Sequence, residues 1–211
     1  MPGQATKRGR NAPRMAPEQR REQILDSALR LVLRDGYGAA TMQAIAREAG
    51  VTRPVVYEFY PDRDELLHEL IGREAEKALS VAVGLMPAVV AGRDLEALIG
   101  QALSSFLGVV AESPDTWRLI LMPPAEAPEA LRAFLHTGRV AVLEQIRTNF
   151  SLLPPPLGGR DADAELLAVV ALAGSEAAAR AMLADPERFP AQRLSAAVTW
   201  VMDQVEIEWS A

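Results

Sequence analysis

The fold is decided by residues 41–63, Thr-Met-Gln-Ala-Ile-Ala-Arg-Glu-Ala-Gly-Val-Thr-Arg-Pro-Val-Val-Tyr-Glu-Phe-Tyr-Pro-Asp-Arg. This stretch predicts two short helices joined by a turn at Gly50 and Val51, where glycine suits a backbone with positive φ. Ile45 and Val56 are among the apolar residues spaced to pack the two helices together. The pattern is that of a helix-turn-helix, the arrangement that places one helix in the major groove of DNA.

Composition favours a helical protein of two parts. The chain has 211 residues, which is enough for a small module joined to a larger one. Apolar residues make up 49% of the chain but aromatic residues only 5%, and no stretch alternates as a strand, so we expect packed helices. The absence of cysteine excludes a disulfide framework, a thiol nucleophile and a thiolate metal site.

Charge is divided unevenly along the chain. Residues 1–60 hold ten Lys/Arg and six Asp/Glu, net +4, whereas residues 61–211 hold twelve and twenty-two, net −10. A basic head can meet phosphates while an acidic remainder stays away from them. Residues 1–16 carry four cations and no periodic apolar pattern, which predicts a basic disordered arm. The sequence leaves open whether this arm is an unstructured tail or an extension that contacts DNA.

Apolar periodicity and breaker residues predict about nine helices. Their predicted ranges are 17–34, 42–49, 53–60, 62–83, 93–111, 114–122, 128–152, 161–183 and 190–210. Thr41, Thr52 and Asp62 stand at N-cap positions, and Gly36 stands where the first helix ends. We therefore predict an all-α fold with a helix-turn-helix DNA-binding domain over 17–61 and a ligand-binding and dimerisation domain over 62–211.

The segment over residues 22–70 resembles the TetR family of repressors. The matching motifs are residues 24–29, 35–37, 41–46, 49–53, Tyr57 and 62–67. Beyond residue 70 only the helix pattern and the length agree with the family. The resemblance implies an N-terminal helix-turn-helix and an all-helical effector domain that dimerises.

The resemblance also implies which residues meet DNA. The positions that face the groove are Arg53, Pro54, Val55, Tyr57 and Glu58, those of phosphate contacts are Thr41, Thr52, Tyr57 and Arg63, and Gln43 is open between DNA and solvent. Chemistry supports Arg53 independently, because a guanidinium can donate two hydrogen bonds to guanine O6 and N7. Two positions depart from the family habit: Glu58 is expected in solvent or paired with an arginine ahead of a contact with cytosine, and Phe59 is expected in the core.

The second half of the chain predicts an interface and a ligand site. Its last two helices carry apolar faces that suit a two-fold, four-helix interface between copies, with contacts at Val170, Gly174, Ala178, Val198, Val201 and Val205. The resemblance places a ligand pocket among Phe106, Trp117, Leu121, Met122, Phe134 and His136. Taken singly, each of these six suits the hydrophobic core better. The scarcity of charges nearby favours an uncharged or amphipathic organic effector, and Arg118 leaves an acidic one open.

These observations predict a ligand-responsive transcription regulator, a repressor that binds a palindromic operator as a homodimer and is released by a small organic effector. Activation instead of repression stays open. The alternative is an all-helical ligand-binding protein or enzyme whose N-terminal helix pair binds no DNA. Catalysis has little support, because His68 and His136 belong to separate helices and no HExxH, GxSxG or phosphate-binding glycine loop is present. We expect no cofactor and no metal. We also expect no membrane association, since the apolar run over 79–90 is too short to span a bilayer, and a cytoplasmic location, which suits a chain without cysteine.

Overall fold

The fold is entirely helical over the residues that the computed structural model describes, 15–84, 95–151 and 164–204. The helices are α1 (Pro17–Asp35), α2 (Met42–Glu48), α3 (Arg53–Phe59), α4 (Arg63–Gly84), α5 (Leu95–Glu112), α6 (Pro114–Leu121), α7 (Glu129–Ser151), α8 (Ala164–Ala184) and α9 (Ala191–Gln204). The all-α prediction is confirmed, and the predicted boundaries within the described ranges differ from these by one residue at most. Of the arm predicted over 1–16, residues 1–14 lie outside the described residues, and Ala16 stands at the N-cap of α1, where its carbonyl accepts from the Arg20 N–H. The predicted boundaries at 93, 152, 161 and 210 also lie outside the described residues.

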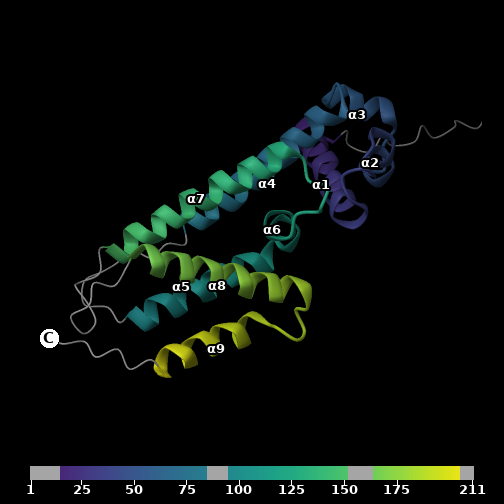
Figure 1. Ribbon diagram of the computed structural model, residues 1–211. Coiled ribbons are helices and arrows are strands. Elements are labelled where there is room, and N and C mark those ends of the chain that lie inside the picture. The colour runs from purple at the N-terminus through teal and green to yellow at the C-terminus, as the bar shows by residue number, and fades with distance from the viewer. Residues whose placement is uncertain (1–14, 85–94, 152–163, 205–211) are drawn as a thin grey trace, which may run out of the picture.

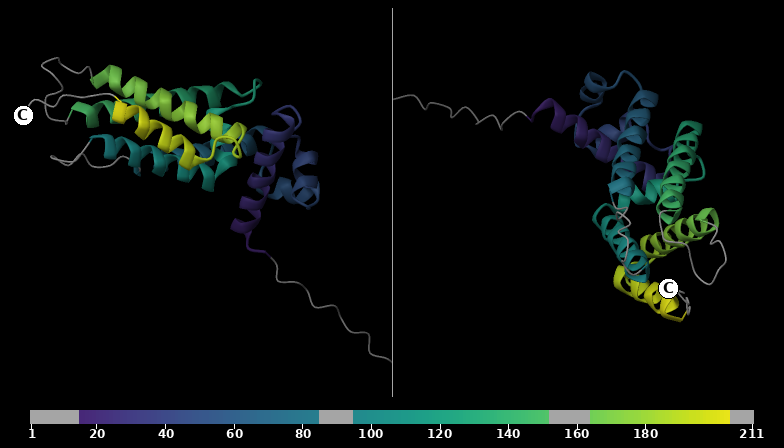
Figure 2. Two further views of the ribbon diagram at one scale, coloured as in Figure 1. Left: turned by 90° about the horizontal axis from the view of Figure 1, so that it is seen from below. Right: turned by 90° about the vertical axis from the view of Figure 1, so that its left-hand side faces the viewer.

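The helices form an elongated molecule with α1, α2 and α3 gathered at one end (Figure 1). Helices α4 and α7 lie side by side and run from this end along the molecule, while α5, α8 and α9 lie together further along (Figure 2). Helix α7 packs against α8, and α5 packs against α9. The helix-turn-helix is therefore presented at one tip, apart from most of the second half of the chain.

A first hydrophobic cluster joins the three N-terminal helices to α4. The side chains fully buried in it include Ile24 and Val32 of α1, Ile45 of α2, Val56 of α3, and Leu66 and Leu70 of α4. Leu119 of α6 and Leu131 of α7 are also buried in this cluster. Packing therefore continues across the domain boundary that the sequence predicts between residues 61 and 62.

A second cluster forms the core of the effector half, residues 62–211, for which the sequence predicts a ligand-binding and dimerisation domain. It contains Ala78 of α4, Leu107 of α5, Trp117 of α6 and Met182 of α8. Helices α4 and α6 thus each bury side chains in both clusters. A displacement of either helix in the second cluster would shift side chains in the first, because packed interiors transmit strain.

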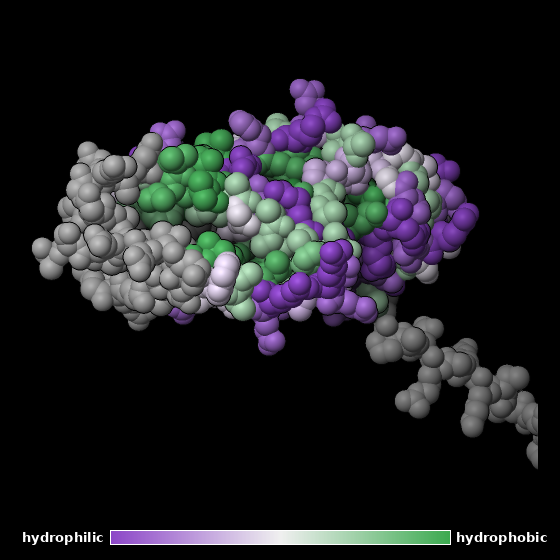
Figure 3. Space-filling view, turned by 60° about the horizontal axis from the view of Figure 1, so that its bottom comes forward, coloured by the Kyte–Doolittle hydropathy of each residue, from purple (hydrophilic) through white to green (hydrophobic). Residues whose placement is uncertain are grey.

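The outer faces of α8 and α9 expose large apolar side chains. Val170 is 62% exposed and Trp200 is 64% exposed, and Val169 and Val201 are exposed beside them. Figure 3 looks onto the side of the molecule that these helices form, and hydrophobic patches lie open between hydrophilic ones. Exposed apolar patches are typical of interaction sites.

Helix α8 also has the length and composition of a membrane span. Its most apolar window has a mean hydropathy of 1.6, and 28% of that window is buried within the described structure. The sequence prediction considered the run over 79–90 and overlooked this helix. An interface helix between two copies has the same composition, since it must be apolar on more than one face.

Candidate nucleic-acid interface and effector cavity

The turn between α2 and α3 has the geometry that the sequence predicts. The hydroxyl of Thr41 accepts a hydrogen bond from the backbone N–H of Ala44 at 3.2 Å, which caps α2. Gly50 has φ +67°, and the N–H of Val51 donates to the carbonyl of Ala46 at 2.9 Å. This hydrogen bond and the left-handed glycine form a Schellman motif, which ends α2 and sets the direction of α3.

Helix α3 buries one face and exposes the other. Val56 is fully buried, and Phe59 is partly buried against the first cluster, as predicted. The prediction that the Thr52 hydroxyl caps α3 is wrong, because Thr52 makes no capping hydrogen bond through its side chain. Pro54 has no N–H to donate, and the N–H of Val55 donates to the Thr52 carbonyl at 3.0 Å. The hydroxyl therefore stays free of the helix start and is exposed.

Most of the residues that the sequence assigns to DNA lie on one exposed tip. The exposed ones are Thr41, Gln43, Thr52, Arg53, Pro54, Tyr57 and Glu58, whereas Val55 and Arg63 are partly buried. Tyr57, an aromatic residue, is 41% exposed on the open face of α3. The exposed side chains come from the starts of α2 and α3 and from the exposed face of α3.

Arg53 and Tyr57 contact each other on the open face of α3. Arg53 Nη2 donates a hydrogen bond to Tyr57 Oη at 2.9 Å, and the guanidinium carbon lies 5.2 Å from the centroid of the tyrosine ring. The contact holds two flexible side chains in one arrangement. Arginine has five N–H donors, so most of the guanidinium stays available to a base or a phosphate.

Arg63 has a structural role that the sequence did not reveal. Its Nε donates to the carbonyl of Ala40 at 2.9 Å, and its Nη2 donates to the carbonyl of Tyr37. These bonds hold the connection before Thr41 against the start of α4. The predicted phosphate contact has no support in this geometry, because two of the donors of Arg63 are already engaged within the protein.

Helix α1 fixes α2 through polar contacts that sequence reasoning missed. Gln23 Nε2 donates to the carbonyl of Ala49 at 2.9 Å. Glu48 pairs with both Arg30 and Arg34 at 3.3 Å, and hydrogen bonding from Arg34 lowers the pKa of that carboxyl. Arg34 is exposed but paired. Such pairs depend on how α1 crosses α2, which no local pattern in the sequence reveals.

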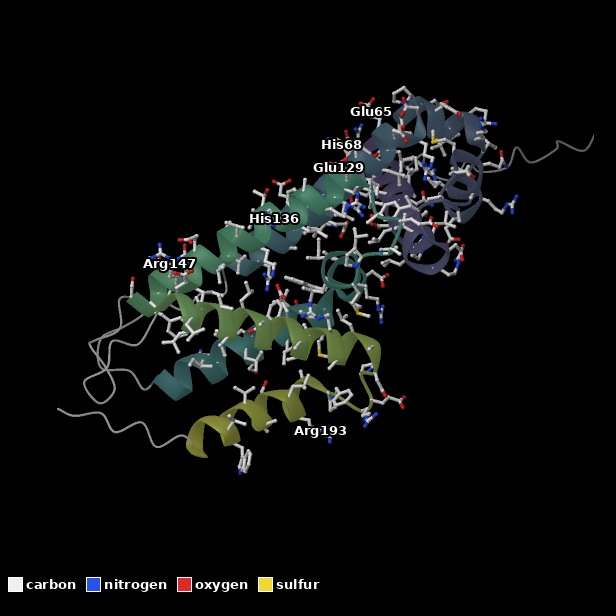
Figure 4. The ribbon with its side chains drawn as sticks, in the orientation of Figure 1. Glu65, His68, Glu129, His136, Arg147 and Arg193 are labelled. Atoms are coloured by element: carbon white, nitrogen blue, oxygen red, sulfur yellow. The ribbon has the colours of Figure 1, made fainter. Side chains whose placement is uncertain are left out.

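A cavity of about 260 Å³ lies in the effector half. Four of the six predicted ligand-site residues line it, namely Phe106, Trp117, Leu121 and Phe134. Met122 and His136 do not: both are exposed, and His136 lies on α7 at the position labelled in Figure 4. The prediction for Met122 and His136 thus has no support in the geometry, because Met122 follows the end of α6 and His136 falls on the outer side of α7.

Three charged residues also line the cavity, and sequence reasoning missed all of them. Arg139 comes from α7, and Glu176 and Arg180 come from α8. Arg118, the cation that the sequence offered, pairs instead with Asp115 at 3.0 Å and does not line the cavity. The missed signal is the i,i+4 spacing of Glu176 and Arg180 on a helix that is otherwise almost free of charge.

Comparison with known proteins agrees with this geometry. Residues 24–70 match the family described as "Bacterial regulatory proteins, tetR family". Similar curated proteins are the HTH-type transcriptional activator FasR of Mycolicibacterium smegmatis, 29% identical over 119 residues, and the HTH-type transcriptional repressor KstR of the same species, 37% identical over 62 residues. The helix-turn-helix segment of this chain is thus similar to the DNA-binding domain of TetR-family regulators. The matches cover 56% and 29% of this chain, but only 52% and 30% of the two relatives, so the chain spans about half or less of their length.

Solved structures match more of this chain. A TetR-like transcriptional regulator from Rhodococcus sp. RHA1 has a TM-score of 0.64 and 25% identity, covering 92% of this chain and all of the other. A tetR-family transcriptional regulator from Streptomyces coelicolor has a TM-score of 0.61 and 25% identity, covering 88% of this chain and 79% of the other. The fold of the effector half is thus shared with TetR-family proteins, although its side chains differ.

Proposed function

We propose that this protein is a DNA-binding transcription regulator that acts as a homodimer on a palindromic operator and responds to a small organic effector. The observation that carries the proposal is the open face of α3, where Arg53 and Tyr57 contact each other on a helix held rigidly by Val56. A rigid recognition helix at the tip of a molecule is the requirement for reading the major groove. The cellular location that follows from a DNA partner is the cytoplasm.

In this proposal the exposed residues bind either a base or a phosphate, according to their chemistry. Arg53 is suited to guanine, because its remaining donors can bind O6 and N7 together. Thr41 and Thr52 present hydroxyls at the starts of α2 and α3, where contacts to phosphate fix register without reading sequence. Glu58 is exposed beside them and reads no base in this proposal.

Two copies are needed to read a palindrome. The exposed apolar residues Val170 of α8 and Val201 of α9 suit a four-helix interface with the same helices of a second copy. Of the other predicted interface residues, Gly174 is exposed and Ala178 and Val198 are partly buried, while Val205 lies outside the described residues. Such an interface would place paired recognition helices about 34–36 Å apart, one turn of DNA.

Effector response requires a path from the cavity to the tip. Ala75 and Ala78 of α4 and Trp117 of α6 line the cavity, while Leu70 and Leu119 of the same helices are buried in the first cluster. A ligand that favours one position of α4 or α6 would change the spacing of the recognition helices. It shifts the balance only by its differential affinity for the two positions.

A buried polar network reinforces this path. The carboxylate of Glu74 is fully buried, accepts a hydrogen bond from the Thr116 hydroxyl of α6, and accepts one from Arg73 Nε at 2.7 Å. Arg73 also pairs with Glu22 and Asp26 of α1. The network therefore joins the residue next to Trp117 to the first helix of the DNA-binding domain, and breaking a buried pair of this kind is costly.

The test is a gel shift with the DNA upstream of the protein's own gene. The wild type should retard this fragment, and higher salt should weaken binding. Arg53→Ala should weaken it about five- to 150-fold, the equivalent of about 1–3 kcal/mol. Arg147→Ala is the matched control, since Arg147 lies on α7 far from the tip and pairs with Glu144 (Figure 4).

Two outcomes separate the proposal from its competitors. If no upstream fragment is retarded, or if Arg53→Ala and Arg147→Ala bind equally well, the helix pair does not read DNA and an all-helical ligand-binding protein becomes the better account. The relatives include both an activator and a repressor. A footprint that overlaps the promoter indicates repression, and one upstream of the promoter indicates activation.

A further inference from the structure

We infer that the effector is an organic anion, a carboxylate with a compact apolar body, held by Arg139 and Arg180 at the mouth of the cavity. The inference rests on the proposed function only in calling the ligand an effector, because the binding site itself is argued from the geometry of the cavity. The sequence favours an uncharged or amphipathic ligand and leaves an acidic one open through Arg118. The acidic choice follows here from other cations, because the charged residues of the cavity come from α7 and α8 and meet only in the folded chain.

One carboxylate holds two guanidinium groups at the cavity. Glu176 Oε1 accepts from Arg139 Nε at 2.8 Å, and Glu176 Oε2 lies 3.5 Å from Arg180 Nη2. Only 14% of the Glu176 side chain is exposed, compared with 52% for Arg139 and 42% for Arg180. The carboxylate is thus set back in the protein, and the two cations stand in front of it toward solvent.

This arrangement carries one positive charge in excess. Glu176 neutralises one of the two arginines, and most of their N–H donors have no partner in Glu176. Arginine favours carboxylates, because its planar fork matches their two oxygens. A single ligand carboxylate would restore neutrality and accept from the donors that Glu176 leaves free. A cationic ligand would have to face two guanidinium groups, which like-charge repulsion opposes.

The remainder of the cavity is apolar and small. Phe106 and Trp117 meet edge to face with ring centroids 5.1 Å apart, and Phe134 and Leu172 are among the other apolar residues that line the cavity. A volume of about 260 Å³ equals roughly nine waters at about 30 Å³ each. This space suits a body of about ten non-hydrogen atoms, such as a medium-chain acid, with the tail inside and the carboxylate at the arginines.

The experiment compares three probes that differ in head group alone. Octanoate, 1-octanol and octylammonium are titrated into the purified full-length protein by calorimetry, with no DNA present. Octanoate should bind at least tenfold more tightly than 1-octanol, and octylammonium should bind more weakly than either. Arg139→Gln and Arg180→Gln should each reduce the ratio of octanoate to octanol affinity about fivefold or more, since hydrogen bonds to charged groups are the strong ones.

The controls keep the result independent of folding. Arg147→Gln removes a cation from the same helix as Arg139 but outside the cavity, and it should leave the ratio unchanged. Gly138→Leu places a side chain into the cavity, where an added Cβ would meet only Phe134 at 4.0 Å, and it should weaken octanoate and octanol together. Each ratio is measured within one variant, and helical circular dichroism shows whether that variant is folded, since a filled cavity and a misfolded chain would both weaken the two ligands together.

The inference is overturned if octanol or octylammonium binds as tightly as octanoate, if no probe binds the wild type, or if the arginine variants behave like Arg147→Gln. Failure of the proposed function has a different appearance. In that case the ligand-free protein does not retard DNA, while the preference for octanoate in calorimetry is unaffected.

Discussion

Arg53 and Tyr57 lie one helical turn apart on α3 and are joined twice, by a 2.9 Å hydrogen bond and by the guanidinium lying 5.2 Å from the ring centroid. The pair restricts the rotamers of a base-reading side chain before any DNA is present. Preorganisation of this kind raises affinity, because less side-chain freedom is lost on binding.

Tyr57→Phe tests the effect of this restriction without changing the charge of the recognition helix. The variant keeps the ring and loses the hydroxyl, so operator affinity should fall about three- to tenfold, in line with about 1 kcal/mol for one hydrogen bond. Fluorescence anisotropy across a salt series measures it, and the slope of log K against log salt should match that of the wild type, because no charge is removed. Unchanged affinity would show that the hydroxyl neither orients Arg53 nor meets phosphate.

Gly50 and Gly72 form a matched pair for backbone strain. A Cβ added at either glycine would meet no atom within 4 Å, but Gly50 has φ +67° whereas Gly72 lies within α4. Gly50→Ala should therefore lower the free energy of unfolding by about 1–2 kcal/mol. Gly72→Ala should raise it by about 0.5–1 kcal/mol through helix propensity. Urea denaturation measures both, and equal effects would contradict the assigned turn.

Arg63 should affect stability more than DNA binding. Arg63→Met leaves the carbonyls of Tyr37 and Ala40 without its two hydrogen bonds, so unfolding should become easier by about 1–3 kcal/mol. At a temperature where the variant is folded, the salt slope of operator binding should be that of the wild type. A slope reduced by about one would instead show that Arg63 contacts a phosphate, as the sequence predicts.

Val170→Glu tests the dimer. A carboxylate on the exposed apolar face of α8 should give monomers in analytical ultracentrifugation, with helical circular dichroism retained and operator affinity strongly reduced. Ala141→Glu places the same charge at an exposed position of α7 and should leave a dimer. A Val170→Glu protein that still sediments as a dimer would place the interface elsewhere.

The Glu69 carboxylate should account for part of the loss of folding stability in acid. Hydrogen bonding from Arg21, together with that from the Tyr60 hydroxyl, holds the pKa of Glu69 below its ordinary value of 4.5. Since the folded-state pKa is the lower one, the ionised carboxylate stabilises the fold above about pH 4.5, and this contribution is lost as pH falls through the folded-state value.

The free energy of unfolding should thus fall between pH 7 and pH 3.5, and by less in Glu69→Gln than in the wild type. Urea denaturation at the two pH values measures the difference. Glu76→Gln, at an exposed position of the same helix, is the control and should keep the response of the wild type. Equal responses in all three proteins would mean that the Arg21–Glu69 pair contributes nothing to stability.

Local signals were enough to predict the helix-turn-helix. Thr41, Gly50 and Asp62 act through hydrogen bonds or φ values within a few residues, and each stands where expected: Asp62 Oδ1 accepts from the Glu65 N–H at 2.9 Å. Thr52 is the exception: Pro54 has no N–H, and the N–H of Val55 donates to the Thr52 carbonyl instead of to its hydroxyl. The sequence reveals only the first of these facts, since Val55 holds the same position after Thr52 that Ala44 holds after Thr41, and the Ala44 N–H does donate to the Thr41 hydroxyl.

The effector site was predictable only in part. Phe106 and Trp117 could be placed near a pocket by the resemblance, whereas the pairing of Arg139 with Glu176 joins residues on two different helices. Long-range pairs depend on crossing angles and on the register of one helix against another, and periodicity along one helix contains neither.

By itself, the sequence determined that the described part of the chain is helical, where the helix ends within that part lie, and which helix forms the recognition tip, because capping, glycine conformation and apolar spacing act over a few residues. Only the tertiary structure decided what Arg63 holds, which charges meet at the cavity, and that α4 and α6 belong to both hydrophobic clusters. These depend on how distant segments pack, and packing brings together residues that are not neighbours along the chain.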